Sequence, residues 1–203
     1  MKRFLLLFLA TVVTAWSASA QLSVSQLRTE HLTDPVGIGE RRPLLSWEVS
    51  DASRRGVTQS AYEIRVKSGG RTVWRTGKVA SAESAGVFYD GTPLTSDTRY
   101  TWQVRVWDDR GKASAWSRPA FWRTGLFDVG EWQARWIEPA VSDDLAAMFR
   151  RTFRVTKPVA EATVYVTAHG IYEASVNGHR VSDDLLTPGW TAYKKRLQYQ
   201  AYD

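Results

Sequence analysis

Three pairs of adjacent aspartates are the most evident candidates for chemistry in this sequence: Asp108-Asp109, Asp143-Asp144 and Asp183-Asp184. Two carboxylates can serve as acid and base in a hydrolysis when both face the same substrate. Neighbouring residues on a strand instead direct their side chains to opposite sides. We therefore interpret the first two pairs as solvated turn aspartates and assign no catalytic residue.

The third pair lies just before a loop that carries two aromatic residues. Carboxylates beside backbone carbonyls suit Ca²⁺, and a bound calcium ion can chelate two sugar hydroxyls. Aromatic faces can stack against a sugar ring. The pattern predicts a carbohydrate-binding loop formed by Asp183, Asp184, Trp190 and Tyr193, with Asp183 and Asp184 as candidate Ca²⁺ ligands. Solvated turn charges and core-filling rings are the alternatives.

Other chemical motifs are missing from the sequence. His31, His169 and His179 lack metal-ligand spacing, and we expect them at the surface or at strand ends. The sequence has no nucleophile elbow and no phosphate-binding glycine loop. Because it also has no cysteine, its stability must come from buried cores rather than disulfides.

The first twenty residues have the pattern of an export signal. Lys2 and Arg3 precede an apolar run over residues 4–15, and Ala18 and Ala20 favour cleavage before Gln21. A membrane anchor is the alternative, but the run is shorter than the roughly 20 residues that span a bilayer. We expect residues 1–20 to be removed and the chain to be periplasmic or extracellular, without a membrane span.

The charge of the chain argues against nucleic acid as a partner. Loss of Lys2 and Arg3 lowers the formal charge from +6 to +4. Nucleic-acid-binding proteins concentrate basic residues on one face. Along this sequence the basic residues of the alternating segments are spread out and are expected to face solvent: Arg65, Lys67, Arg99 and Arg105.

Nearly every periodic segment after Gln21 alternates with period two, which is typical of half-buried antiparallel strands. The segment LLSWEV places Leu45 and Trp47 on one face, and RYTWQVRVW does the same for Trp102. Turn signals separate these segments. An all-β fold is predicted, with a fibronectin-III or immunoglobulin-like β-sandwich over residues 21–126.

Residues 127–131 are predicted to link this sandwich to a second domain over residues 132–203. Trp132 and Trp136 are expected to pack the two domains together. FRRTFRV, ATVYVTAHG and YEASVNGHRV have strand patterns, and Asn177-Gly178 is predicted to form a hairpin turn. The final segment, RLQYQAYD, also alternates. A sandwich needs more strands than this, so we expect the second domain to be incomplete.

The order and spacing of these segments resemble one family. HLTDPVGIGERRPLLSWEVS, QSAYEIRV and YTWQVRVWDDRGKASAWS resemble the N-terminal fibronectin-like domain of bacterial α-L-rhamnosidases of glycoside hydrolase family 78. WQARWI, FRRTFRV and residues 165–203 resemble the jelly roll that follows it, which implies a partial jelly roll here. The resemblance also extends to rhamnose-binding modules, in which an acidic pair acts in calcium-dependent binding.

The resemblance implies the N-terminal part of an exported enzyme that removes terminal α-L-rhamnose from plant glycans or glycosides with inversion. It further implies that the catalytic glutamates lie on an (α/α)6 barrel beyond Asp203, so the missing C-terminal domain would be a partner. A non-enzymatic exported carbohydrate-binding or adhesion module is the alternative, because fold alone does not establish function. Activity on another terminal sugar is a third possibility.

Overall fold

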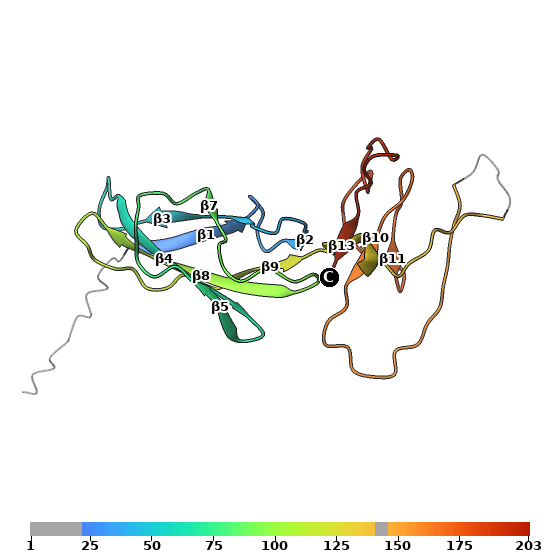
Figure 1. The fold of residues 1–203 in the computed structure, drawn as a ribbon, viewed down its shortest axis with the longest axis horizontal. Coiled ribbons are helices and arrows are strands. Elements are labelled where there is room, and N and C mark those ends of the chain that lie inside the picture. The colour runs from blue at the N-terminus through green and yellow to red at the C-terminus, as the bar shows by residue number, and fades with distance from the viewer. Residues whose placement is uncertain (1–21, 141–145) are drawn as a thin grey trace, which may run out of the picture.

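The computed structural model describes residues 22–140 and 146–203, and its regular structure is almost entirely β-strand (Figure 1). The predicted export signal and Asp143-Asp144 lie outside these residues. In the described part, the only helical element is a single 3₁₀ turn, η1, at Val129–Glu131. The prediction of an all-β fold is therefore confirmed.

Two sheets form the sandwich. The smaller sheet has the order β1-β3-β7, and the larger has the order β2-β9-β8-β4-β5, with β6 also paired to β4. The strands of the smaller sheet are Ser23–Thr29 (β1), Leu44–Ser50 (β3) and Val87–Phe88 (β7). Those of the larger sheet are Val36–Ile38 (β2), Gln59–Ser68 (β4), Arg71–Arg75 (β5), Val79–Ala80 (β6), Arg99–Asp108 (β8) and Ala120–Thr124 (β9).

The core lies between the two sheets because alternate residues of each strand face inward. Leu45 and Trp47 of β3 are buried against Ile64 of β4 and Trp102 of β8. The predicted inward faces are thus confirmed. Trp122 of β9 is also fully buried, and its ring stacks on Tyr100 at 5.3 Å between centroids.

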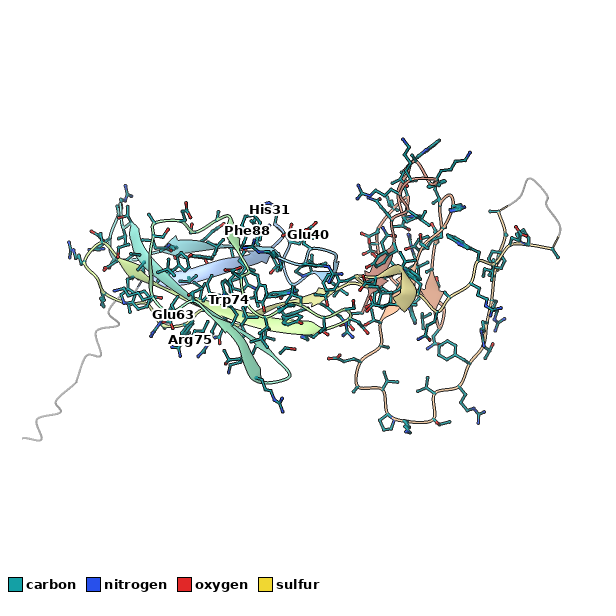
Figure 2. The ribbon with its side chains drawn as sticks, viewed as in Figure 1. His31, Glu40, Glu63, Trp74, Arg75 and Phe88 are labelled. Carbon is teal, nitrogen blue, oxygen red and sulfur yellow. The ribbon has the colours of Figure 1, made fainter. Side chains whose placement is uncertain are left out.

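One acidic residue on the outer side of the larger sheet is buried as well. Glu63 is only 3% exposed. Its Oε1 accepts a hydrogen bond of 2.7 Å from Arg75 Nε, and its Oε2 accepts one of 2.8 Å from Arg105 Nε. Figure 2 shows Glu63 beside Arg75 on this sheet. Burial raises the pKa of Glu63, but the hydrogen bonds from Arg75 and Arg105 outweigh it and hold that pKa below 4.5.

Glu63 should therefore give this protein a stability that depends on acid pH. A carboxyl group with a lowered pKa in the folded state stabilises the fold above its unfolded pKa and loses that effect as the pH falls through its folded pKa. We expect Glu63→Gln to lower the free energy of unfolding by about 1–2 kcal/mol at pH 7. The difference should shrink below pH 4.5. Urea unfolding of both proteins across this range is the measurement, and a difference independent of pH would contradict the assignment.

The described residues of the second part, 129–140 and 146–203, contain four short strands. Val164–Val166 (β10) pairs with Gln200–Tyr202 (β13), and Ser175–Val176 (β11) pairs with His179–Arg180 (β12). The β11–β12 turn has positive φ at Asn177 and Gly178, as the sequence predicted. Residues 149–155, expected as a strand, are not in one. No described neighbour pairs with their backbone, and alternation alone does not hold a strand.

Large apolar side chains are concentrated on the surface of this second part. Met148 is 93% exposed and Phe153 is 73% exposed. Sixteen exposed large apolar residues occur among the described ones, and fourteen of them lie at or after Val129. Contiguous exposed apolar surface usually marks a site of contact with other polypeptide.

Candidate functional site

The two parts of the chain meet at the end of β9. Tyr199 Oη accepts a hydrogen bond of 2.8 Å from the Leu126 amide and donates one of 3.1 Å to the Leu126 carbonyl. A Cβ at Gly125 would overlap that same hydroxyl. The Trp132 ring lies edge-on to Tyr199 at 5.3 Å and to Tyr165 at 6.4 Å. We call the contacts of Tyr199 with Gly125, Leu126 and Trp132 the seam. Both ring partners of Trp132 lie in the second part, so its expected role between the two parts stays a prediction. The same expectation is wrong for Trp136, which is 63% exposed because its ring packs on His169 within the second part.

A charged cluster extends the seam. Arg123 Nε donates to Asp97 Oδ1 at 2.8 Å, and its Nη1 donates to Glu161 Oε2 at 3.0 Å. Tyr165 Oη donates to the same Asp97 oxygen at 2.6 Å. Burial raises the pKa of Asp97, but the bonds from Tyr165 and Arg123 outweigh it, so its pKa lies below its ordinary value. The cluster holds β9 to residues of the second part.

Asp183 and Asp184, the predicted calcium ligands, are both exposed. The Asp184 amide donates to Ser182 Oγ at 3.0 Å. Across residues 22–140 and 146–203, no group of three or more His, Cys, Asp or Glu is placed to hold a metal ion. Two adjacent carboxylates fall short of the six to eight oxygen ligands that Ca²⁺ takes. The residues present do not by themselves fit the ion.

Tyr193 lies in an aromatic stack. Its ring is nearly parallel to that of His169, at 5.2 Å and an interplanar angle of 8°. Trp136 contacts His169 at 4.5 Å, and Tyr193 Oη accepts a hydrogen bond of 3.1 Å from the Gly170 amide. His169 therefore covers one face of the Tyr193 ring. Nothing in the sequence around His169 connected it to this loop.

Trp190 is the predicted binding residue with the most open surface. Its side chain is 95% exposed. Tyr193 is instead half-buried in its stack with His169, so the two rings have different surroundings. The structure does not gather the four predicted residues around one cavity, and their role in carbohydrate binding stays a prediction.

Asp108-Asp109 has a structural role. Arg54 Nη2 contacts Asp108 Oδ2 at 3.3 Å and Asp109 Oδ1 at 2.8 Å. Asp108 Oδ1 also accepts hydrogen bonds from the amides of Arg110 and Lys112. The expectation of a solvated turn pair is wrong for Asp108, which is buried because its oxygens hold the turn that follows β8.

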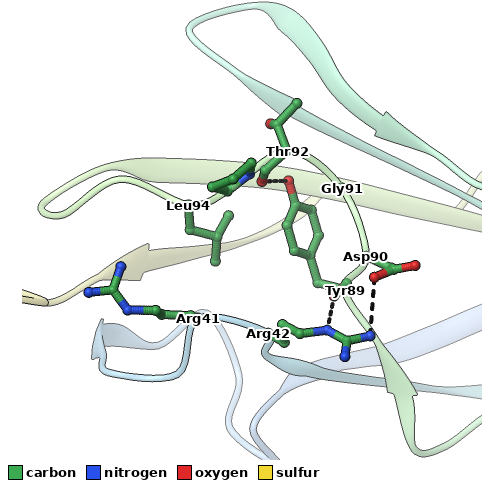
Figure 3. A pocket seen from close by; sticks show the side chains of 8 residues that line it. Arg41, Arg42, Tyr89, Asp90, Gly91, Thr92 and Leu94 are labelled. Carbon is green, nitrogen blue, oxygen red and sulfur yellow. Dashed lines mark hydrogen bonds and ion pairs between the residues drawn. The ribbon is translucent and has the colours of Figure 1, made fainter.

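The sandwich also carries a hollow of about 250 Å³ between residues 41–42 and 89–94 (Figure 3). Arg42 pairs with Asp90 at 3.1 Å, and the Tyr89 hydroxyl donates to the Thr92 carbonyl at 2.8 Å. Arg41 lies over the Phe127 ring, with its guanidinium carbon 4.5 Å from the centroid. The polar side chains that line the hollow are thus engaged with the protein itself, which favours a structural role.

Two family models match the chain in the order that the resemblance implied. The model described as Rha78A-like, N-terminal immunoglobulin domain matches residues 24–128. The model described as Alpha-L-rhamnosidase N-terminal domain matches residues 157–203. The chain belongs to the α-L-rhamnosidase family. Its sandwich is accordingly the immunoglobulin-like N-terminal domain of that family.

Curated proteins support the same family. An α-L-rhamnosidase of Formosa agariphila is 32% identical over 192 residues, which cover 86% of this chain and 21% of that protein. An α-L-rhamnosidase of Streptomyces avermitilis is 37% identical over 201 residues, which cover 83% of this chain and 19% of that protein. The chain thus spans about a fifth of the length of these relatives.

Solved structures support the same family. The α-L-rhamnosidase from Dictyoglumus thermophilum has a TM-score of 0.81 and 34% identity, with 89% of this chain and 23% of that chain covered. The Streptomyces avermitilis α-L-rhamnosidase complexed with L-rhamnose has a TM-score of 0.56 and 33% identity, with 90% of this chain and 20% of that chain covered.

Proposed function

We propose that this chain is the N-terminal, non-catalytic part of an exported α-L-rhamnosidase. Such an enzyme would hydrolyse terminal α-L-rhamnose from plant glycans or glycosides, with inversion at the anomeric carbon. The observation that carries the proposal is the alignment with α-L-rhamnosidases over 86% of this chain and only 21% of their own length. The acid and the base would lie on further polypeptide.

The physical role of the chain would be to support that further polypeptide. The seam fixes residues 129–203 to a sandwich with its own core. The exposed apolar side chains after Val129 would then pack against the catalytic part, which explains why they are concentrated there. The C-terminal catalytic domain is thus the proposed partner, with rhamnose-containing glycans as the substrates.

Export is proposed from the leader pattern of residues 1–20, with the periplasm or the extracellular space as the destination. Within the ranges that the structure describes, no helix is long and apolar enough to cross a membrane.

The proposed function is tested by assaying two proteins on an aryl α-L-rhamnoside. The product of the complete coding sequence should release L-rhamnose with inverted anomeric configuration, as seen by NMR of the first product. The 203-residue chain should release none above the blank. Release by the chain alone, or a coding sequence that ends after Asp203, would contradict the proposal.

The calcium hypothesis for the Asp183-Asp184 loop has its own test. It predicts that calorimetry of the full protein with L-rhamnose gives a heat of binding with Ca²⁺ and a much smaller one with a chelator. The double variant Asp183→Asn/Asp184→Asn should lose the calcium-dependent heat. The same heat with Ca²⁺ and with the chelator, or no heat in either condition, would remove the hypothesis.

A further inference from the structure

The positive charge of this protein is concentrated on one sheet. Strands β4, β5, β8 and β9 carry seven basic residues and two acidic ones, a net charge of +5. Of these residues, Arg123 is paired with Asp97 and Glu161, and Asp108 is bound to Arg54 in a turn, so neither belongs to the exposed charge of the sheet. The basic residues looked scattered along the sequence, but the strand pairing brings them together.

Strand register places the basic residues of β4 and β8, together with Arg75 of β5, on the side of the sheet opposite the core. Glu63 is opposite Arg105, and Lys67 is opposite Thr101, in the antiparallel pair β4–β8. Arg65 is opposite Arg75 on β5. Their neighbours in sequence fill the core, so these side chains point away from it. We define the cationic face by six residues: Arg65, Lys67, Arg75, Lys78, Arg99 and Arg105.

Aromatic rings separate several of these cations in a regular series. Lys78 Nζ lies 4.7 Å from the Trp107 ring centroid, and the Arg105 guanidinium lies 5.0 Å from the same ring. Arg105 also lies 5.0 Å from the Trp116 centroid, and Arg65 lies 4.2 Å from it. The series is thus cation, ring, cation, ring, cation. Rings hold the cations in place without neutralising them.

The carboxylate of Glu63 offsets only one of these six charges. Its side chain is 4% exposed, so it lies beneath Arg75 and Arg105 rather than at the surface. The cationic face therefore keeps a net charge of about +5 directed to solvent, which attracts anions over roughly one Debye length of about 8–10 Å.

The arrangement suits an extended anion. Guanidinium groups bind carboxylates and sulfates through two parallel hydrogen bonds. Stacking and hydrogen bonds to Gln103 and Glu63 already fix Arg65 and Arg105, so less side-chain freedom is lost when their remaining N–H groups bind an anion. A ten-residue strand such as β4 is about 34 Å long, which matches a polymer better than a single sugar. Half-exposed edges of Trp107 and Trp116 between the cations offer apolar contact to sugar rings.

We propose that the cationic face binds an anionic polysaccharide, through its carboxylate or sulfate groups, and so holds the enzyme on its substrate. The choice of a polysaccharide over other polyanions rests on the proposed function, an exported enzyme that acts on glycans. The bound groups would lie on the sandwich, away from the apolar surface of residues 129–203.

The test is binding of the 203-residue chain to polygalacturonate and to dextran sulfate, by affinity electrophoresis at low salt. Lys67→Glu/Arg99→Glu reverses two charges of the cationic face at exposed or half-exposed positions. Lys194→Glu/Lys195→Glu makes the same change of charge in the second part and is the matched control. We expect the first variant to bind at least about tenfold more weakly and the control to change less than about twofold. Binding should also weaken with added salt.

Several results would overturn this proposal. Equal weakening in both variants would mean that only net charge matters. Equal binding of neutral dextran would remove the role of anionic groups. Tighter, face-dependent binding to duplex DNA or to vesicles of anionic phospholipid would assign the face to another partner.

Thermal melts of the variants identify any loss of folding, and Lys67→Gln/Arg99→Gln repeats the test with milder changes. Because hydrolysis is not measured, a failure here leaves the proposed rhamnosidase function standing, and failed hydrolysis leaves this binding result standing.

Discussion

Replacing Trp122 with alanine is expected to lower the free energy of unfolding of the sandwich by about 3–5 kcal/mol. Trp122 is fully buried in β9. Its ring stacks on Tyr100 at 5.3 Å and lies edge-on to Tyr89 at 5.9 Å. Removal leaves a cavity between the two sheets and breaks both aromatic contacts. Urea unfolding followed by far-UV circular dichroism measures the change.

Two further variants sharpen this result. Trp122→Phe keeps a ring and removes an indole N–H that has no hydrogen-bond partner among the described residues, so it should cost less, about 1–2 kcal/mol. Trp190→Ala removes an exposed tryptophan and should change stability by less than about 0.5 kcal/mol. Similar losses from Trp122→Ala and Trp190→Ala would contradict the location of the core.

Gly125→Ala is expected to break the Tyr199 contact of the seam while the Arg123–Asp97–Glu161 cluster stays in place. The new Cβ would overlap the Tyr199 hydroxyl and lie 3.1 Å from the Gly37 carbonyl oxygen. Tyr199 would have to move, which breaks its two hydrogen bonds to Leu126. Each net hydrogen bond contributes about 0.5–1.5 kcal/mol, so the Leu126 amide should exchange with solvent at least about tenfold faster. Hydrogen exchange measured by NMR reports the exchange rate of the Leu126 amide.

Gly39→Ala is the matched control because a Cβ there meets nothing within 4 Å. Tyr199→Phe keeps the ring and removes only the hydroxyl, so it should raise the same exchange rate. Amides of β4 and β8 should be unaffected in all three variants. An unchanged rate at Leu126 in Gly125→Ala would show that the seam does not depend on this close approach.

The strands of the sandwich could be predicted from sequence because a half-buried strand alternates with period two. Leu45, Trp47 and Trp102 follow that rule, and each is buried. The Asn177-Gly178 turn was predictable because few other residue pairs adopt positive φ twice. Order and spacing of the same segments were sufficient to indicate the family, which both family models confirm.

Features that depend on which strands pair could not be predicted. Trp116 lies outside any strand, so nothing in its local sequence places it between Arg65 and Arg105. The burial of Glu63 likewise requires Arg75 and Arg105 to arrive from two other strands. In the loop, the sequence singled out Tyr193 but not its stack on His169, because 24 residues separate them and tertiary contact alone unites them.

We propose that the apolar side chains after Val129 lie against further polypeptide of an α-L-rhamnosidase. Hydroxyl-radical footprinting tests it by comparing oxidation of Met148 and Phe153 in the 203-residue chain and in the product of the complete coding sequence, with Phe88 on the sandwich as the reference. We predict that oxidation of Met148 and Phe153 falls at least about tenfold in the longer protein, while oxidation of Phe88 stays the same. Equal oxidation of Met148 and Phe153 in both proteins would contradict this packing.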